Sequence, residues 1–477
     1  NRQVVNVILQ EDVGQLDEVV VVGYGQQKRE SVVGAISAIS PDRLVTGNTR
    51  SLSNELAGKL SGVIAVQRSG EPGYDNSNFW IRGISTFQGN RDPLVLVDGI
   101  ERNINDLDPE EIESFSILKD ASASAVYGVR GANGVILIQT KRGVVGKPRV
   151  IAKVEQSFTS PTKIPSFVGA PEYLGVLNEI EREAGRNPKY SEEYIENTLK
   201  GVDPELYPNI NWFDEVLKDY GNNTRASVDV NGGSEILRYS FVAALFREGG
   251  ILERDKSQGW NSSLRLKRYN MRANVDLNLS PSTLMRFNIG GYLQERIAPP
   301  QSIDQIFSDA FQTPPHVHPP RYSTGEIPRV TERPNVWSNL TQTGYERNNS
   351  NKIETLFSLE QDLKALLPGL KLKGTFSFDS YSSNKVKREK SPDYYLPATG
   401  RDPETGELDL VINSYGQMFL GHEKDSDFGN SSTYFEGTLT YDQTLGQDHT
   451  LNGLFMYNQR HFDDGSALPF RYQGIAG

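Results

Sequence analysis

The chain has no cysteine among its 477 residues. Without thiols it has neither a disulfide framework nor a thiolate metal site, which excludes cysteine-stapled secreted domains and zinc-finger sites. The lack is compatible with a cell-envelope protein that needs no redox control.

Long hydrophobic runs are also missing. No stretch reaches the roughly 18 consecutive apolar residues of a transmembrane helix, and the mean hydropathy is -0.50. A transmembrane β-barrel also averages to polar hydropathy, because its strands alternate lipid-facing and lumen-facing residues. A membrane location therefore stays open. Asn1-Arg2-Gln3 does not begin a signal peptide, so any export leader is expected to be removed or to lie upstream.

Positive charge is in deficit: the formal net charge is -11, which argues against nucleic acid as the main partner. Glycine and aromatic residues are plentiful, with 44 Gly, 21 Tyr and 20 Phe. Aromatic side chains suit pleated strands and glycine suits turns, so the composition favours a mainly β protein.

Residues from about 30 to 145 mix short strands and short helices. The runs 93–99 and 135–140 are apolar and end at turn signals, which predicts buried strands. Asp108 followed by Pro109 and two acids predicts a helix that begins there.

From residue 146 the hydrophobic period changes to two. Met271, Ala273 and Val275 alternate with Arg272, Asn274 and Asp276, and the same alternation recurs down the chain. It predicts about nine strands, near 149–158, 224–233, 237–247, 268–280, 283–295, 351–364, 369–382, 430–443 and 448–461.

The predicted connections alternate between tight turns and long excursions, the latter near 159–223, 248–267, 296–350 and 383–429. Outer-membrane barrels sort their loops in this way, with short periplasmic turns and long outer loops. A polar-faced soluble β-sandwich or solenoid is the alternative that the periodicity leaves open. About nine strands do not close a plugged barrel of about 22, so we expect an incomplete barrel whose chain ends in an outer loop.

Five segments carry distinctive motifs: DEVVVVGYG at 17–25, IRG at 81–83, PLVLVDG at 93–99, LKDASASAVYG at 118–128 and RGANGVI at 130–136. Together they resemble the SusC-like TonB-dependent transporters of bacterial outer membranes. The first is similar to the family's TonB box, the next two to its plug signatures, and the last two to its longer plug block.

The resemblance implies an α/β plug domain inside a large antiparallel transmembrane β-barrel. It divides the chain into the tail of a carboxypeptidase-regulatory-like extension (1–14), a TonB box (15–25), the plug (26–145) and the first part of the barrel (146–477). The TonB box works by strand addition to a partner's sheet. Its residues here are Asp17, Glu18, Val19, Val20, Val21, Val22, Gly23 and Tyr24, with Gly23 and Gly25 expected to end the strand and leave a tether.

The family imports large ligands, foremost oligosaccharides and in some members peptides. Its partners are a SusD-like surface lipoprotein that closes over the barrel, TonB with ExbB and ExbD, and outer-membrane lipid. The resemblance thus implies an integral outer-membrane transporter without catalytic residues, cofactor or metal. A TonB-dependent siderophore or cobalamin receptor is an alternative. A secreted glycan-active enzyme is another, although none of the acids stands in a catalytic motif.

Two groups of plug residues are candidates for specific roles, one for ligand binding and one for structural ion pairs. Aromatic, amide and basic side chains in two plug loops suit sugar binding, namely Tyr74, Asn76, Phe87, Gln88, Asn90 and Arg91. Four charged residues are expected to form structural ion pairs, within the plug or against the wall, namely Arg82, Lys119, Asp120 and Arg130.

Other polar features of the sequence are not expected to form ligand or metal sites. The glycines of 128–134 lack the order of a phosphate-binding loop and are expected to form tight turns. His316 and His318 have no further ligand at metal spacing. The acids Glu423, Asp425 and Asp427 are expected in a solvated outer loop.

Overall fold

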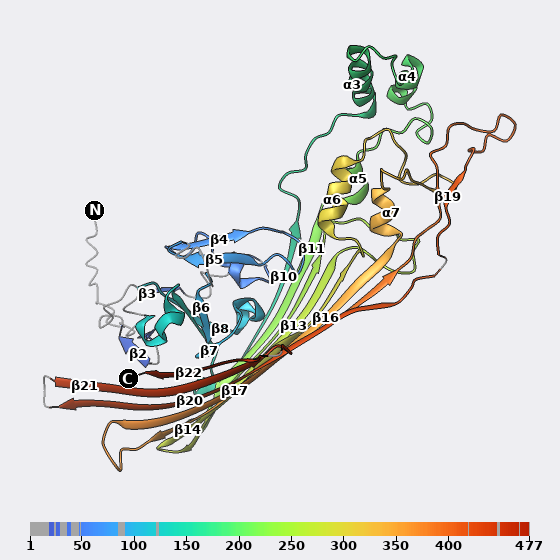
Figure 1. Cartoon of the computed structure of the whole chain (residues 1–477). Helices are drawn as coiled ribbons and strands as arrows, with labels where there is room; N and C mark the ends of the chain where they lie inside the picture. Colours follow the sequence, from blue (N-terminus) through green and yellow to red (C-terminus); the bar gives the residue numbers. More distant parts are fainter. Residues whose placement is uncertain are drawn as a thin grey trace, which may run out of the picture.

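The computed structural model has a small N-terminal domain and a large curved sheet (Figure 1). It describes residues 19–22, 25–28, 36–39, 47, 49–83, 91–120, 124–417, 419–445, 449–466 and 468–476. The N-terminal domain (residues 36–145) lies against one face of the sheet, which we call the wall (residues 146–476).

A five-stranded sheet organises the N-terminal domain, in the order β3-β8-β9-β6-β7. β6 and β9 are parallel and confirm the strands expected at 93–99 and 135–140. The hydrophobic core includes Leu56, Phe115 and Ile136, all fully buried. The strands are β3 Ile36–Ile39, β6 Leu94–Val97, β7 Ile100–Glu101, β8 Ile112–Leu118 and β9 Val135–Thr140, with a separate hairpin of β4 Val63–Gln67 and β5 Ser77–Ile81.

The prediction of a helix that begins at Asp108 is wrong beyond the first turn. Asp108 caps a single 3-10 turn, η4 Pro109–Glu111, by accepting a hydrogen bond from the Glu110 backbone N–H at 2.9 Å. The chain then enters β8, which pairs with β9 along most of its length. Pairing with a buried neighbour overrides the local helix signal.

Ten antiparallel strands form the wall, each hydrogen-bonded to the next along the chain. Nine coincide with the strands predicted from the period of two. The tenth strand, β22, was not predicted, because its alternation is short and weak in the sequence. It corrects the predicted number of strands and stands where an outer loop was expected, at residues 470–476. The strands are β10 Gly146–Thr159, β11 Gly221–Gly233, β12 Leu237–Gly249, β13 Arg265–Ser280, β14 Thr283–Ala298, β16 Gly344–Asp362, β17 Leu370–Glu389, β20 Glu423–Leu445, β21 His449–Asp463 and β22 Phe470–Ala476.

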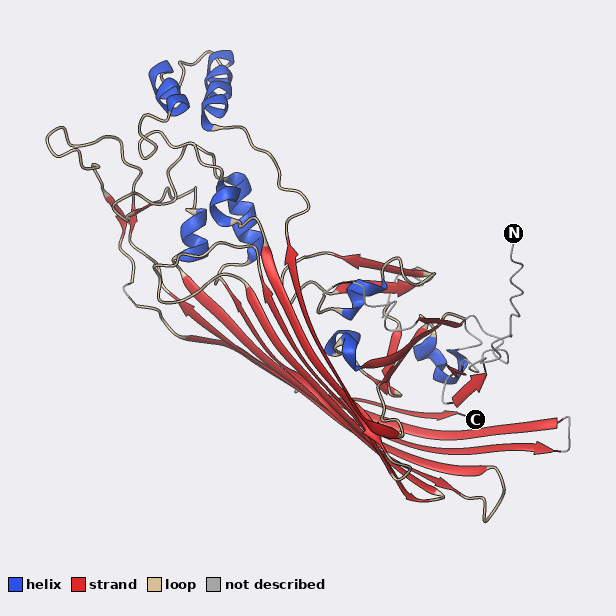
Figure 2. Ribbon diagram, turned by 180° about the vertical axis from the view of Figure 1, so that it is seen from behind, coloured by secondary structure: helices blue, strands red, loops and turns tan. Residues whose placement is uncertain are grey.

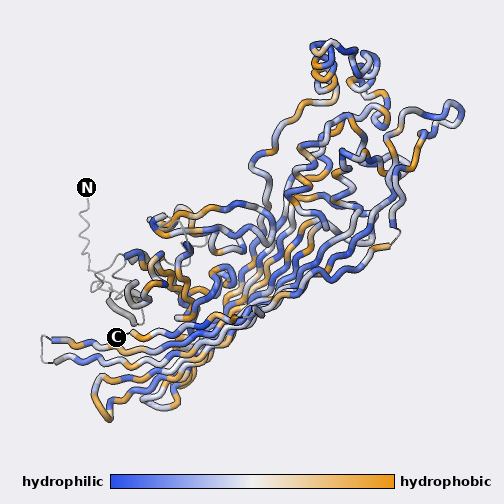
Figure 3. Tube along the Cα trace, in the orientation of Figure 1, coloured by the Kyte–Doolittle hydropathy of each residue, from blue (hydrophilic) through white to orange (hydrophobic). Residues whose placement is uncertain are grey.

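The two faces of the wall differ in polarity, and the polar face is the buried one. On β13, Arg272 and Asn274 are each 3% exposed, whereas Met271 is 57% exposed. Hydrophilic and hydrophobic residues alternate along the wall strands (Figure 3). A water-soluble sandwich buries its apolar faces instead, so the arrangement excludes the sandwich that the sequence left open. It is the distribution of a membrane barrel, with lipid outside and a polar interior.

All the long connections gather at one end of the wall (Figure 2), and those between β10 and β11 and between β14 and β16 carry helices that the sequence did not predict. Trp212, Phe213, Ile306 and Leu340 belong to a second hydrophobic core there. The elements are α3 Ala170–Glu183, α4 Glu192–Lys200, α5 Trp212–Val216, α6 Ile303–Gln312 and α7 Val336–Thr341, with a small sheet of β15 Ile327–Pro328, β18 Tyr394–Tyr395 and β19 Ile412–Ser414. Among the described residues, no helix is both long and apolar enough to cross a membrane.

The expected outer loop at 383–429 is shorter than predicted, because strands extend into it from both sides. β17 continues to Glu389 and β20 begins at Glu423. The acids Glu423, Asp425 and Asp427 therefore belong to a strand, which corrects their assignment to a loop. Lys385 pairs with Asp425 at 2.9 Å.

Candidate functional site: the interface between the N-terminal domain and the wall

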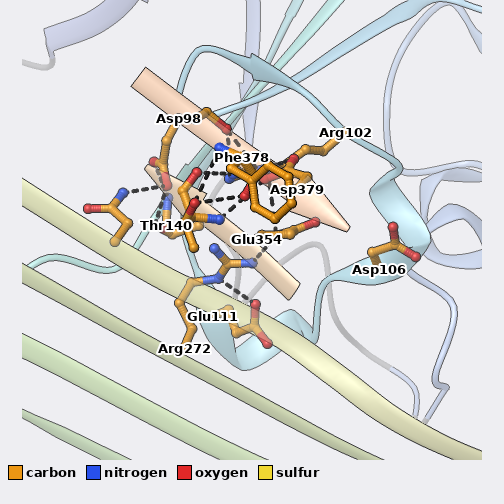
Figure 4. A network of polar contacts seen from close by, with 12 residues as sticks. Asp98, Arg102, Asp106, Glu111, Thr140, Arg272, Glu354, Phe378 and Asp379 are labelled. Carbon is orange, nitrogen blue, oxygen red and sulfur yellow. Dashed lines mark hydrogen bonds and ion pairs between the residues drawn. The ribbon is translucent and has the colours of Figure 1, made fainter. Parts of the chain in front are cut away.

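Polar side chains of the wall meet the N-terminal domain along the buried face of the sheet. Five charged residues form a continuous chain of ion pairs there (Figure 4). In this series of ion pairs, residues of the N-terminal domain pair with residues of the wall. Its members are Glu111 and Arg102 from the domain and Arg272, Glu354 and Asp379 from β13, β16 and β17.

Arg272 is the centre of this chain. Its Nε donates to Glu111 at 2.7 Å and its Nη2 to Glu354 at 2.6 Å. Gly290, opposite Arg272 on β14, makes room for the guanidinium, since a Cβ there would lie 2.6 Å from the Arg272 Cζ. Both carboxylates are 1% exposed, so each depends on Arg272 to balance a desolvated charge.

Arg102 extends the chain of ion pairs from the other side. Its Nε and Nη2 each donate to the Asp379 carboxylate at 2.8 Å. Glu354 is 3.8 Å away and thus lies between two guanidinium groups. A two-point pair of this kind fixes orientation as well as charge. The contact therefore holds the loop after β7 in one position against the wall.

A second group of contacts lies where the domain joins the wall. Thr140, at the end of β9, donates to Asp98 at 2.6 Å and accepts from Asn274 at 2.8 Å. The next two residues reach the wall as ion pairs, Lys141 with Asp229 at 2.7 Å and Arg142 with Asp276 at 2.8 Å. Residues 141–142 are thereby fixed to two strands of the wall, β11 and β13.

Asp106 lies beside the ion-pair chain and has a perturbed acidity. Burial raises its pKa to about 6, and the nearby Glu354 carboxylate adds to the rise, while the Arg268 guanidinium opposes it. The assembled state therefore favours the protonated acid. Asp106 destabilises the assembly once it ionises.

We expect wild-type protein to lose stability as the pH rises through 6. The raised pKa stabilises the assembled state at low pH, and this contribution disappears above the folded pKa. The free energy of unfolding should fall by about 1 kcal/mol between pH 5 and pH 8, and Asp106→Asn should remove this change. Denaturant unfolding of the full-length protein in detergent measures it. Asp409→Asn, in an exposed loop, is the control, and an unchanged pH dependence in Asp106→Asn would contradict the expectation.

The four predicted structural charges make the following contacts. Arg82 pairs with Asp120 at 2.5 Å, and Lys119 donates to the Ser61 carbonyl. Arg130 pairs with Glu101, which also pairs with Arg460 of β21. The last contact connects the glycine-rich segment to the wall through a shared carboxylate.

Of the ligand candidates, the structure describes Tyr74, Asn76 and Arg91. Tyr74 is 58% exposed, and the Arg296 guanidinium lies 4.5 Å from its ring centre. Asn76 accepts a hydrogen bond from Arg50 at 2.9 Å, and Arg91 is exposed. Phe87, Gln88 and Asn90 lie outside the described residues.

Val19–Val22 of the expected TonB box form strand β1, which pairs with β2, Gly25–Lys28. Gly25 thus begins a strand, so it is not the tether that the sequence predicted. Asp17, Glu18, Gly23 and Tyr24 lie outside the described residues, as do residues 1–14.

The two histidines have packing roles. His316 bonds to the Tyr190 hydroxyl at 2.8 Å and stacks on Tyr173, while His318 is fully buried and contacts the Pro319 carbonyl. Burial lowers the pKa of His316 to about 4. Within the described ranges, no group of three or more His, Cys, Asp or Glu residues is arranged to hold a metal ion.

The ion-pair chain was not identified as a site from the sequence, although one signal for it exists. Arg272, Glu354 and Asp379 all occupy polar positions of alternating strands, on the face away from lipid. A charge there must be paired or reach water. The partners of these charged residues cannot be identified from the sequence, because they lie at least 80 residues away, as Glu354 does from Arg272.

Comparison with known proteins gives one family match. Residues 28–135 match the model of the TonB-dependent Receptor Plug Domain. The match covers most of the N-terminal domain, including the segments that carry Arg102 and Glu111.

The similar proteins are TonB-dependent receptors. The chain is 32% identical to TonB-dependent receptor SusC of Bacteroides thetaiotaomicron over 55% of its length and 26% of that protein. It is 27% identical to TonB-dependent receptor P39 of Formosa agariphila over 98% of its length and 41% of that protein. The chain thus spans about a quarter to two fifths of the length of these relatives.

Among solved structures, the RagAB peptide importer in its open-open state is similar, with a TM-score of 0.72 at 19% identity. The match covers 96% of this chain and 53% of the solved one. The closed-closed state gives a TM-score of 0.69 at 18% identity. At this level of sequence identity, the similarity concerns the fold alone. In this fold a domain lies against the polar face of a curved wall.

Proposed function

We propose, from the premise that the chain belongs to the SusC-like TonB-dependent transporters of the bacterial outer membrane, that it serves the active import of a large ligand. In this proposal residues 26–145 are the plug, residues from 146 onward are barrel strands, residues 15–25 are the TonB box and residues 1–14 are the tail of an N-terminal extension. The family consists of transporters and receptors, and no bond of the ligand is made or broken.

The observation that carries the proposal is the buried ion-pair chain between plug and wall. A plug that only filled the lumen would need no network of desolvated charges. Glu111 and Arg102 hold it in one defined position, yet the contacts are polar and become hydrated once water enters. Buried ion pairs of this kind contribute less to stability than to a specific arrangement, which suits a domain that is held firmly and then remodelled.

We propose that the ligand is an oligosaccharide, with a peptide as the alternative because a protein of similar fold is described as a peptide importer. Tyr74, on a plug loop, presents an exposed ring beside Arg296. Exposed aromatic rings next to hydrogen-bonding groups stack well on sugars. Asn76 and Arg91, and with them Phe87, Gln88 and Asn90, complete the proposed contacts.

The proposed partners follow from the same premise. A SusD-like lipoprotein would close over the long connections of the wall, and TonB, powered by ExbB and ExbD, would pull on the TonB box. The helices α5, α6 and α7 share a hydrophobic core. They therefore offer a preformed surface to a lid.

Uptake by living cells tests the proposal. A strain that lacks the gene and the complemented strain are given fluorescent oligosaccharides or fluorescent peptides of similar mass. We expect energy-dependent accumulation of the oligosaccharides only with the gene, abolished by a protonophore. Accumulation of peptides alone would favour the alternative, and equal accumulation without the gene would contradict the import of either ligand.

A further inference from the structure

The lipid-facing side of β12, β13 and β14 changes character toward the end that carries the long connections. Up to that level its residues are apolar or aromatic, including Phe241, Met271 and Leu293, which are 40%, 57% and 59% exposed. Beyond it stand cations. Arg247 continues the outward positions of β12, and Lys267 and Arg265 continue those of β13.

These three cations lie close together. Arg247 and Lys267 are direct partners in the register of β12 and β13, and Arg265 is diagonal to Arg247. Side chains directly opposite each other on neighbouring strands start about 5 Å apart at Cβ, and like charges there destabilise the sheet. Glu295 faces Lys267 from β14 and offsets part of the charge. A net positive patch remains.

Apart from the partial offset by Glu295, the described part of the chain does not neutralise this patch. Within the part of the chain that the structure describes, the side chains of Arg247, Lys267 and Arg265 have no ion pair or hydrogen bond. The inward-facing arginines of β13 and β14, in contrast, have hydrogen-bond partners in the N-terminal domain. Arg268 donates to the Asp106 carbonyl at 2.6 Å and Arg296 to the Pro72 carbonyl at 3.0 Å. The unmatched charge is thus confined to the outward face.

We propose that Arg247, Lys267 and Arg265 bind the phosphorylated headgroup of a lipid in the outer leaflet. Cations at the border of an apolar band attract anionic headgroups, and each contributes about 1 kcal/mol near a charged membrane surface. The apolar band directly below the patch accommodates the acyl chains. This continuity favours a lipid over free phosphate, which would use the cations alone. The proposal depends on the orientation in the membrane and not on the imported ligand.

Native mass spectrometry of the full-length protein in detergent tests this proposal. The probes are phosphorylated lipid A and the same lipid after enzymatic removal of its phosphate. We expect wild-type protein to retain the phosphorylated form preferentially. The variant R247E/K267E should bind it at least about tenfold more weakly, as expected for loss and reversal of two charges.

The matched control is K364E/K371E, which reverses two cations near the short turn at the other end of the wall. It should bind the phosphorylated lipid as wild type does. Heat-modifiable migration in gels shows that each variant barrel is folded. Equal binding by R247E/K267E and wild type, or equal binding of the two lipid forms, would overturn the proposal.

Discussion

Deletion of residues 17–25 is expected to abolish uptake while ligand binding at the cell surface is unchanged. Transport by strand addition needs an extended segment whose main chain pairs with the edge of a partner's sheet. Val19–Val22 form such a segment, β1, which pairs on one side with β2. Among the described residues no strand other than β2 pairs with β1, and we propose that its other edge accepts the partner.

A smaller change separates main-chain pairing from side-chain contacts. Val21→Pro removes a backbone N–H on the edge of β1 that faces away from β2 and should reduce uptake about as much as the deletion, whereas Val21→Ala keeps the N–H and should retain most of the uptake. Both variants are compared by uptake of the labelled ligand and by its binding to intact cells at low temperature. Normal uptake by the deletion variant would contradict the assignment of a TonB box, and equal uptake by the two Val21 variants would contradict main-chain pairing.

The sequence predicted the wall well because its signal is local. A strand with one face toward lipid and one toward a polar interior repeats every two residues, so a window of ten residues contains the pattern. Met271 and Arg272 are next to each other in the sequence and on opposite faces in the structure. β22 was missed because its seven residues offer only a short alternation.

The long connections and the ion-pair chain depend on contacts far apart in the sequence. α5 and α6 are short, and their apolar residues are buried by each other and by α7. Arg102 and Asp379 are separated by 277 positions, so neither residue alone shows that it has a partner. Sequence patterns identify which face a charge occupies. They do not identify the charge that neutralises it.

Arg272→Met should destabilise the assembled protein more than any other single change at the interface. The substitution keeps much of the side-chain volume but leaves Glu111 without its cation and Glu354 with Arg102 alone, at 3.8 Å. Removing one partner of a buried ion pair costs about 3–5 kcal/mol, since the remaining charge stays desolvated. We expect this loss in denaturant unfolding of the full-length protein, together with greater permeability of cells to large antibiotics.

Arg247→Met is the matched control because it removes an arginine from the neighbouring strand β12, on the opposite face of the wall. In detergent, without the proposed lipid, this surface substitution should change the free energy of unfolding by no more than about 0.5 kcal/mol. Arg272→Lys provides a graded test, since an ammonium group keeps the charge but does not reproduce the planar two-carboxylate contact. We expect its stability between those of wild type and Arg272→Met. If Arg272→Met and Arg247→Met unfold at the same denaturant concentration, the ion-pair chain does not hold the plug.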